Sequence, residues 1–295
     1  MDHLLERPPR AGRSSSGVRP IDVVRALLPP GAINPFLSSY ARLISPALVV
    51  RAVIATAVGR PVPKSLTAAA TALAAGEPVL LFDAHDREGE TDLVILSERA
   101  TPELVRLLRR DAGGWICTAI SDELRTRLGL PFYADLLTRA AKAYPILDAL
   151  GHEELRYDRR SPFGVHLHHR ATYTGIPDND RARAIRAIGE LARDAPHLSD
   201  AALRARFTAE FSSPGHLPVI YAAPRLLSER KGHTELSVSL ARMAGLSESV
   251  TVCEMLGDSG GARVPDAARE YAEEHGWPFL EGRTVVEAWK RWSSA

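Results

Sequence analysis

The chain contains only two cysteines in 295 residues, Cys117 and Cys253. Two widely separated thiols supply neither a disulfide framework nor the paired spacing of a zinc site. A chain without structural disulfides is typical of a reducing compartment, so we expect a cytoplasmic protein. The N-terminal region also lacks the uninterrupted apolar segment that a signal peptide needs.

Long hydrophobic runs and a surplus of one charge are missing as well. The most apolar stretch, residues 43–58, carries Arg51 in its middle and falls short of the roughly 20 residues that a membrane-spanning helix needs. Lys and Arg together number 37 and Asp and Glu number 36, which gives a formal net charge of +1. Because no overall field attracts polyanions, we expect a soluble protein with neither a nucleic acid nor a membrane as partner.

Regular patterning starts near residue 63. Residues 1–62 are rich in Arg, Pro and Ser at first and then hold apolar runs broken by prolines. We expect them to form a partly disordered N-terminal extension whose role the sequence does not reveal. Residues 63–295 show no internal repeat and no linker that would divide a domain, so we expect one compact domain there.

Apolar runs typical of buried strands alternate with segments typical of helices from residue 64 onward. Strands are expected at residues 78–83, 91–97, 115–120, 163–168, 217–222 and 249–253. Helices are expected to begin near Ser65, Thr101, Ser121, Pro177, Ser199, Thr234, Pro265 and Arg283. Residues 130–160 are irregular and are expected to form a loop. This interleaving predicts an α/β (α+β) fold with a mixed β-sheet covered by helices.

Three carboxylates, Glu88, Glu90 and Asp92, are spaced two residues apart in front of an expected strand. Alternate residues of an extended segment point to the same side, so the three would share one face. Such a face suits Mg²⁺ or Mn²⁺, which prefer oxygen ligands, or a carboxylate base whose pKa is tuned by its neighbours. A solvated strand edge explains the pattern equally well. The adjacent Arg87 can pair with a phosphate or a carboxylate in fork geometry.

A basic loop that contains Gly232 opens another expected helix. Unpaired backbone N–H groups at a helix start attract anions, and Arg230, Lys231 and the hydroxyl of Thr234 would reinforce phosphate binding there. His233 can instead bind a metal through a neutral imidazole. An ordinary helix cap with incidental positive charge is the alternative interpretation.

Further candidates stand alone in the sequence. His216 follows Pro214-Gly215, a pair that can hold a side chain on a loop facing a cleft, although single loop histidines are more often solvent-exposed bystanders. Glu254 comes at the end of an expected strand, where ligand sites of α/β proteins gather. Cys117 is interpreted as a small core residue that can also line a cleft. The three histidines within residues 166–169 are interpreted as solvent-facing or structural.

Six short stretches, taken in order, carry a resemblance to a known family. They are Asp86–Asp92, Asp111–Thr118, Thr174–Ala182, Ser213–His216, Gly232–Glu235 and Cys253–Met255. Together they resemble 3,4-dihydroxy-2-butanone 4-phosphate synthase, especially its archaeal form, over about Ser65 to Trp292. The resemblance implies a homodimer with active sites near the subunit interface. It also implies conversion of D-ribulose 5-phosphate to L-3,4-dihydroxy-2-butanone 4-phosphate and formate with Mg²⁺, or alternatively Mn²⁺, as cofactor.

The same resemblance implies a role for individual residues. Glu88 and His233 would bind the metal, and His216 and Glu254 would be the catalytic pair. Substrate contacts would come from Arg87, Glu88, Asp92, Arg230, Lys231, Gly232, His233, Thr234 and Glu254. Supporting positions around the pocket would be Asp83, Glu90, Cys117, Thr174 and Asp180.

Two other functions stay open on the sequence alone. A binding or regulatory protein could keep the fold and lack turnover, but the joint presence of Glu88, His216, His233 and Glu254 argues against this. A metal-dependent phosphohydrolase could use the same carboxylates. That enzyme would release inorganic phosphate, whereas the synthase would release formate and keep the phosphate ester intact.

Overall fold

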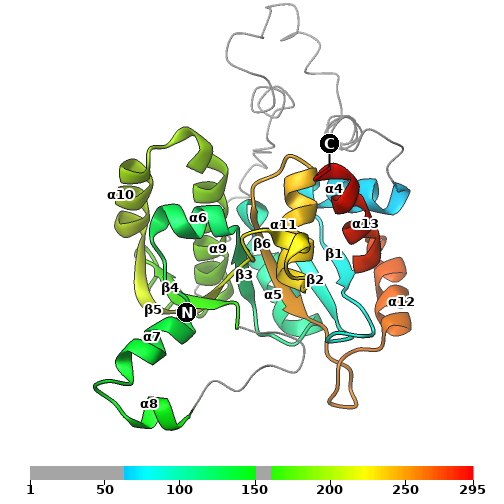
Figure 1. The fold of residues 1–295 in the computed structure, drawn as a ribbon. Helices are drawn as coiled ribbons and strands as arrows, with labels where there is room; N and C mark the ends of the chain where they lie inside the picture. The colour runs from blue at the N-terminus through cyan, green and yellow to red at the C-terminus, as the bar shows by residue number, and fades with distance from the viewer. Residues whose placement is uncertain (1–62, 151–160, 295) are drawn as a thin grey trace, which may run out of the picture. The chain divides into compact units, whose positions relative to one another are not determined.

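The structure is a computed structural model that describes residues 63–150 and 161–294. The predicted extension at residues 1–62 lies outside the described residues. The elements in chain order (Figure 1) are α4 (Lys64–Ala75), β1 (Val79–Phe82), β2 (Thr91–Leu96), η1 (Ser97–Arg99), α5 (Pro102–Asp111), β3 (Cys117–Ile120), α6 (Asp122–Leu128), α7 (Tyr133–Ala140), α8 (Ile146–Ala149), β4 (Phe163–His169), α9 (Asp178–Asp194), η2 (Ala195–His197), α10 (Asp200–Glu210), β5 (Phe211–Tyr221), η3 (Leu226–Ser228), α11 (His233–Met243), β6 (Ser249–Glu254), α12 (Pro265–His275), β7 (Phe279–Glu281) and α13 (Gly282–Trp292).

The strands form one seven-stranded sheet in the order β4-β5-β3-β6-β2-β1-β7. Strands β1 and β7 are parallel, as are β3 and β5, and the other neighbours are antiparallel. Helices cover both faces of the sheet, because the strands carry apolar side chains on both sides and these must be shielded from water. The predicted α/β (α+β) fold with a mixed sheet covered by helices is confirmed.

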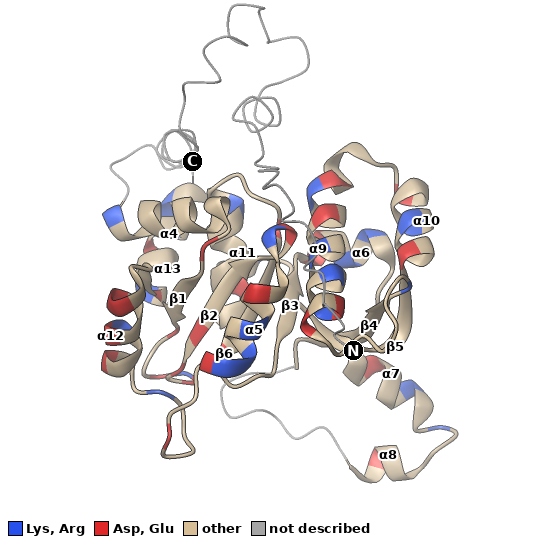
Figure 2. Cartoon of the chain, turned by 180° about the vertical axis from the view of Figure 1, so that it is seen from behind, with Lys and Arg blue, Asp and Glu red and all other residues tan. Residues whose placement is uncertain are grey.

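Two apolar clusters lie on opposite faces of the sheet. Helices α4, α11 and α13 contribute to the first cluster, with Leu66 and Leu236 among its buried residues. Helices α5, α9 and α12 contribute to the second, with Val105 and Ile185 among its buried residues. Figures 1 and 2 view the molecule from opposite sides, with α11 in front of the strands in the first and α5 in front in the second.

Hydroxyl caps begin three of the helices, at the predicted starts. The side chains of Thr101, Ser121 and Ser199 each accept a hydrogen bond from the backbone N–H three residues later. These bonds satisfy one of the backbone donors that a helix start leaves without an intrahelical partner. The helix predicted to begin near Ser65 does begin there, at Lys64, but its N-cap is Pro63 and Ser65 lies inside the helix.

The expected loop at residues 130–160 was also wrong where the structure describes it. Residues 133–140 form α7 and residues 146–149 form α8, and neither helix buries a residue within the chain. Two short helices that pack into no core of their own give little periodicity for a sequence to show. The remainder of this segment, residues 151–160, lies outside the described residues.

Strand β5 is longer than predicted. It begins at Phe211 rather than near residue 217, so His216 lies on a strand and not on a loop. Leu167 of β4 pairs with Leu217, and the next residue, His168, pairs with Ser212, so residues 213–216 form an irregularity of the strand between these two pairs. The short edge strand β7 was not predicted and pairs with β1.

Charges of both signs are mixed along α9 and α10 (Figure 2). One example joins α9 to α10, where Arg206 lies 2.8 Å from both Asp194 and Glu210. Such mixing gives no extended surface of one sign on these helices. Among the described residues, none of the helices combines the length and the apolar character that crossing a membrane requires.

Helix α9 packs tightly on η1 at Gly189. A Cβ added to Gly189 would lie 2.1 Å from the backbone nitrogen of Glu98. Because backbone atoms cannot move aside as a side-chain end can, we expect Gly189→Ala to lower the free energy of unfolding by about 2 kcal/mol or more. Denaturant unfolding followed by circular dichroism measures this change.

Gly261→Ala is the matched control for that experiment. Nothing lies within 4 Å of a Cβ added at Gly261. Its free energy of unfolding should stay within about 0.5 kcal/mol of the parent protein. A Gly189→Ala protein as stable as the parent would contradict the close approach of α9 to η1.

Candidate active site

Three segments that are far apart in the chain meet at one end of the central strands. Asp92 at the start of β2 pairs in register with Glu254 at the end of β6. His233 is the first residue of α11 and lies beside the loop that joins β1 to β2. The two middle strands and one helix start therefore position the acidic and basic groups together.

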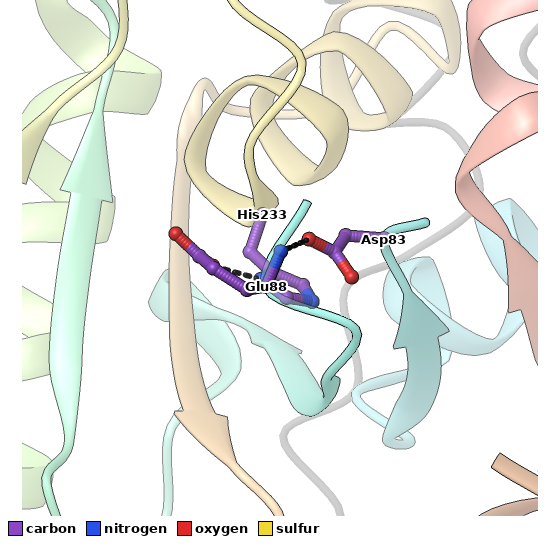
Figure 3. Close-up of side chains that lie close together, drawn as sticks. All are labelled: Asp83, Glu88 and His233. Carbon is purple, nitrogen blue, oxygen red and sulfur yellow. Dashed lines mark hydrogen bonds and ion pairs between the residues drawn. The ribbon is translucent and has the colours of Figure 1, made fainter. Parts of the chain in front are cut away.

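Asp83 organises the acidic loop. Its buried carboxylate accepts the backbone N–H of Glu88 and that of Glu90, each at 3.1 Å. The backbone N–H of Asp83 donates in return to the carbonyl of Glu90 at 3.1 Å. Figure 3 shows Asp83 reaching the backbone of Glu88 while the side chain of Glu88 lies against His233. One carboxylate thus sets the path of the chain through the site.

His233 contacts the acidic loop through both ring nitrogens. Nδ1 lies 3.2 Å from Oε2 of Glu88, and Nε2 lies 3.1 Å from the carbonyl oxygen of Glu90. A carbonyl oxygen only accepts, so Nε2 carries a hydrogen and donates it to Glu90. The lone pair of a neutral ring would then lie on Nδ1 and face Glu88. A backbone carbonyl that fixes the tautomer in this way is typical of a metal-binding histidine.

The donor set fits a small divalent cation. Ligand atoms of Asp83, Glu88 and His233 all lie within 4.8 Å of one another. Both oxygens of Asp83 already accept backbone hydrogen bonds, which leaves Glu88 and His233 as the better placed pair. Adjacent ligands of an octahedral Mg²⁺ with bonds of about 2.1 Å are about 3 Å apart. The 3.2 Å between Nδ1 and Oε2 agrees with that spacing.

Asp92 lies on the other side of the imidazole. Its side chain is buried, and Oδ1 lies 3.6 Å from Nε2 of His233 without a hydrogen-bond partner among the described residues. Burial raises the pKa of Asp92 and the facing imidazole opposes this, which leaves the pKa at about 7. A buried carboxylate oxygen that accepts no hydrogen bond is costly, so a hydrogen-bond donor that reached it would stabilise the site.

Burial and the charges of neighbouring side chains together cause the remaining pKa shifts in the site. Burial raises the pKa of Glu90 and of Glu254, and repulsion from neighbouring carboxylates raises both further. Burial also acts to raise the pKa of Glu88, but the hydrogen bond and the charge of His233 outweigh it and lower the value. For His233, burial acts to lower the pKa, and the carboxylates of Asp92 and Glu88 outweigh it and raise the value to about 9. Neighbouring groups whose pKa values are pushed apart suit acid–base chemistry.

A cavity of about 210 Å³ opens beside this cluster. Its wall includes Trp115, Phe163 and Ile220, which the sequence analysis did not single out, although Trp115 belongs to one of the six matching stretches. Glu254, whose side chain is partly exposed, lies on the same wall. Residues predicted from the sequence that line the cavity are Glu88, Asp92, Cys117, Arg230, His233, Thr234 and Glu254.

Positive charge gathers on one side of the cavity, around Gly232. A Cβ added there would lie 2.3 Å from a guanidinium nitrogen of Arg230 and 2.8 Å from one of Arg87. The missing side chain therefore lets both groups approach the start of α11. Arg230 donates a hydrogen bond to Glu235 at 2.6 Å. Glu235 ends the Gly232–Glu235 stretch but was not among the predicted site residues. Lys231 is exposed and lines a second pocket of about 830 Å³, which shares Arg230 with the cavity.

His216, Thr174 and Asp180 form a separate group. Nδ1 of His216 lies 3.0 Å from the carbonyl oxygen of Thr174, and Asp180 accepts a backbone N–H of the same loop at 2.9 Å. The ring of His168 packs edge-on against His216 at 5.0 Å between centroids. None of these four is among the described residues that line the cavity. Within one chain, His216 and Glu254 therefore belong to different groups.

Comparison with known sequences supports the family resemblance. Residues 67–288 match the family model for 3,4-dihydroxy-2-butanone 4-phosphate synthase. A curated protein of that name from Methanosarcina mazei is 45% identical over 233 residues, which cover 78% of this chain and 93% of the relative. The protein of that name from Archaeoglobus fulgidus is 44% identical over 218 residues, which cover 73% and 90%.

Solved structures agree with the sequence comparison. The 3,4-dihydroxy-2-butanone 4-phosphate synthase of Candida albicans is 27% identical with a TM-score of 0.56, covering 77% of this chain and 98% of that one. A synthase solved in complex with two magnesium ions is 25% identical with a TM-score of 0.57, covering 74% and 92%. The prediction from six short stretches is confirmed: the chain belongs to the 3,4-dihydroxy-2-butanone 4-phosphate synthase family, with archaeal members among its relatives.

Proposed function

We propose that the protein converts D-ribulose 5-phosphate to L-3,4-dihydroxy-2-butanone 4-phosphate and formate in riboflavin biosynthesis. Membership of the synthase family supports this activity. The observation that carries the proposal is the pair of donor atoms on Glu88 and His233, 3.2 Å apart on the wall of a cavity lined with further carboxylates. Mg²⁺ is the proposed cofactor, as in the magnesium complex of the solved relative, and Mn²⁺ suits the same donors.

The reaction needs proton transfers at several carbons of one small sugar. A proton leaves C1 to give an enediol, the C1 hydroxyl is lost, the carbon skeleton shifts, and hydration then releases C4 as formate. A divalent cation at Glu88 and His233 supplies Lewis acidity to the oxygens that gain negative charge. Glu254 lies on the cavity wall with a raised pKa, which suits a group that takes up and returns protons.

The basic side of the cavity suits the phosphate of the substrate. Arg230 and Thr234 line the cavity at the start of α11, where backbone N–H groups favour an anion. Arg87 approaches the same helix start across Gly232. A phosphate held there provides binding energy away from the reacting carbons, which keeps a small flexible sugar in place.

We also infer that the protein acts as a homodimer. Trp115 on the cavity wall is 56% exposed, and its ring centroid lies 6.4 Å from that of His166, which stacks on Tyr133 of α7. Helix α7 buries none of its residues within the chain, and Ile146 of α8 is 67% exposed. A strip of exposed aromatic and aliphatic side chains that continues from a cavity is typical of a surface covered by a partner.

A two-fold dimer would explain the position of His216. The interface of such a dimer pairs a surface with the same surface on the partner. Strands β4 and β5 carry both His166 of the aromatic strip and the exposed His216. Covering the strip therefore brings the His216 group of one copy toward the cavity of the other, where Glu254 lies.

The proposal also covers the domain bounds, the cellular location and the partners of the protein. We assign residues 63–295 to the synthase domain and residues 1–62 to an N-terminal extension of the sequence. We infer a cytoplasmic location, because both cysteines of the chain are buried and free, as is usual in a reducing compartment. Neither a nucleic acid nor a membrane is a partner, in keeping with the net charge of +1.

The first test concerns the metal and the product. With ribulose 5-phosphate and Mg²⁺, the protein should release formate, and EDTA should abolish the release. Glu88→Gln keeps the shape of the side chain and removes its charge, so Mn²⁺ should bind at least ~10-fold more weakly and formate release should fall at least ~100-fold. Calorimetric titration with Mn²⁺ and a formate assay measure the two effects.

The matched control is Glu274→Gln, which changes an exposed glutamate on α12. Both Mn²⁺ affinity and formate release should equal those of the parent protein. Release of inorganic phosphate in place of formate would contradict the proposed reaction and support a phosphohydrolase.

The second test asks whether the site is shared between copies. His216→Ala and Glu254→Gln should each inactivate the homodimer. In a purified hybrid dimer of the two variants, one of the two sites has both original residues, so about half of the parent activity should return. Co-expression with two different affinity tags gives the hybrid, and formate release gives its activity.

A hybrid of Glu88→Gln with Glu254→Gln serves as the control. These two residues line the same cavity of one chain. Each site of that hybrid therefore contains one substituted residue, and the hybrid should stay inactive. An inactive His216/Glu254 hybrid would contradict the shared site.

A further inference from the structure

Glu235 is a buried carboxylate that none of the roles above uses. Its side chain is 0% exposed, and it is not among the described residues that line the 210 Å³ cavity. Oε2 accepts a hydrogen bond from Nη1 of Arg230 at 2.6 Å, and Oε1 accepts the backbone N–H of Ala223 at 2.8 Å. Each oxygen therefore holds a different segment of the protein.

The two bonds join three parts of the structure at one point. Glu235 lies in the first turn of α11, Ala223 follows the end of β5, and Arg230 belongs to the loop before α11. A charged hydrogen bond to a guanidinium is short and directional, and burial strengthens it. Such a bond restricts the long side chain of Arg230 far more than solvent would.

A second restraint acts on the same guanidinium. Gly232 presents a bare Cα to it, and an added Cβ would lie 2.3 Å from Nη1 of Arg230. Arg230 is only 15% exposed and lines both the 210 Å³ cavity and the adjoining 830 Å³ pocket. The guanidinium is thus held at the boundary between the two spaces, by Glu235 on one side and the start of α11 on the other.

We propose that Glu235 is a positioning residue that fixes the Arg230 guanidinium to receive the phosphate group of the substrate. This inference rests on the proposed function for the identity of the substrate. Glu235 does not touch the phosphate, and its own negative charge opposes phosphate binding. Its contribution is to hold the arginine in one orientation, so that less side-chain freedom is lost when the ligand binds.

Two explanations for a buried acid beside an anion site predict opposite results. If Glu235 acted only through its charge, Glu235→Gln would tighten phosphate binding by removing repulsion. If it positions Arg230, the same change weakens binding, because glutamine offers one acceptor oxygen where two donors need one each. Arg230 or the Ala223 N–H then loses its hydrogen bond to residue 235.

The experiment measures inorganic phosphate binding by calorimetry on the full chain, which needs no turnover. For Glu235→Gln we expect the Kd for phosphate to rise about tenfold, with a similar rise in KM for ribulose 5-phosphate and a kcat within about twofold. Tighter or unchanged phosphate binding would overturn the inference. Because phosphate binding is measured directly, the result stands apart from whether formate is the product.

Glu248→Gln is the matched control for stability. Glu248 follows α11 and accepts hydrogen bonds from Arg242, near the end of α11, at 2.6 and 2.5 Å. Neither residue is among the described residues that line the cavity. Loss of this pair should weaken the fold without changing the phosphate Kd. An equal rise in the phosphate Kd of both variants would show a general effect of destabilising α11 and would overturn the positioning role.

Two further variants test the route through Arg230. In an Arg230→Gln background, adding Glu235→Gln should cause no further loss of phosphate affinity, because the group that it positions is gone. Additive losses would contradict the inference. If Glu235→Gln does not fold, Arg230→Lys replaces it: lysine keeps the charge and can pair with Glu235 but lacks the fork, so phosphate should bind about tenfold more weakly. Parent-like affinity in Arg230→Lys would overturn the positioning role.

Discussion

The antiparallel pairing of β2 with β6 is the constraint on which the site depends. It places Asp92 opposite Glu254, and the pairing continues past the strand end where the N–H of Met255 donates to the carbonyl of Thr91 at 2.8 Å. A slip of one residue would turn the carboxylate of Glu254 to the other face of the sheet. Close packing resists such a slip, because each face of the two strands fits a different apolar cluster.

The hydrogen bonding of buried polar groups differs between the middle of the sheet and the end that carries the site. In the middle, the hydroxyl of Thr251 lies 3.0 Å from those of Ser97 and Thr118, so the three satisfy one another. At the functional end, Asp92 has an oxygen without a hydrogen bond and His233 is surrounded by carboxylates. Stability is lower where acids are crowded together, which is the usual consequence of building a charged site into a fold.

The sequence predicted much of the fold because most strands bury both faces. Runs such as residues 91–97 therefore appear as continuous apolar segments, and hydroxyl caps at Thr101 and Ser121 mark where helices begin. Helix α7 and the first half of β5 were missed for a related reason. These segments bury few residues within one chain. They therefore lack the regular apolar pattern that packing against the core gives to the other elements.

The amino-acid sequence by itself determined which chemical groups are available and which local segments carry them: the acidic loop, the basic loop before α11 and Glu254 at a strand end. Only the tertiary structure decided which of these groups meet. It brought Glu88 within 3.2 Å of His233, gave Arg230 a buried partner in Glu235, and left His216 outside the cavity lining. Local patterns reflect local backbone preferences, whereas contacts between distant segments depend on strand register and helix packing, which no short stretch contains.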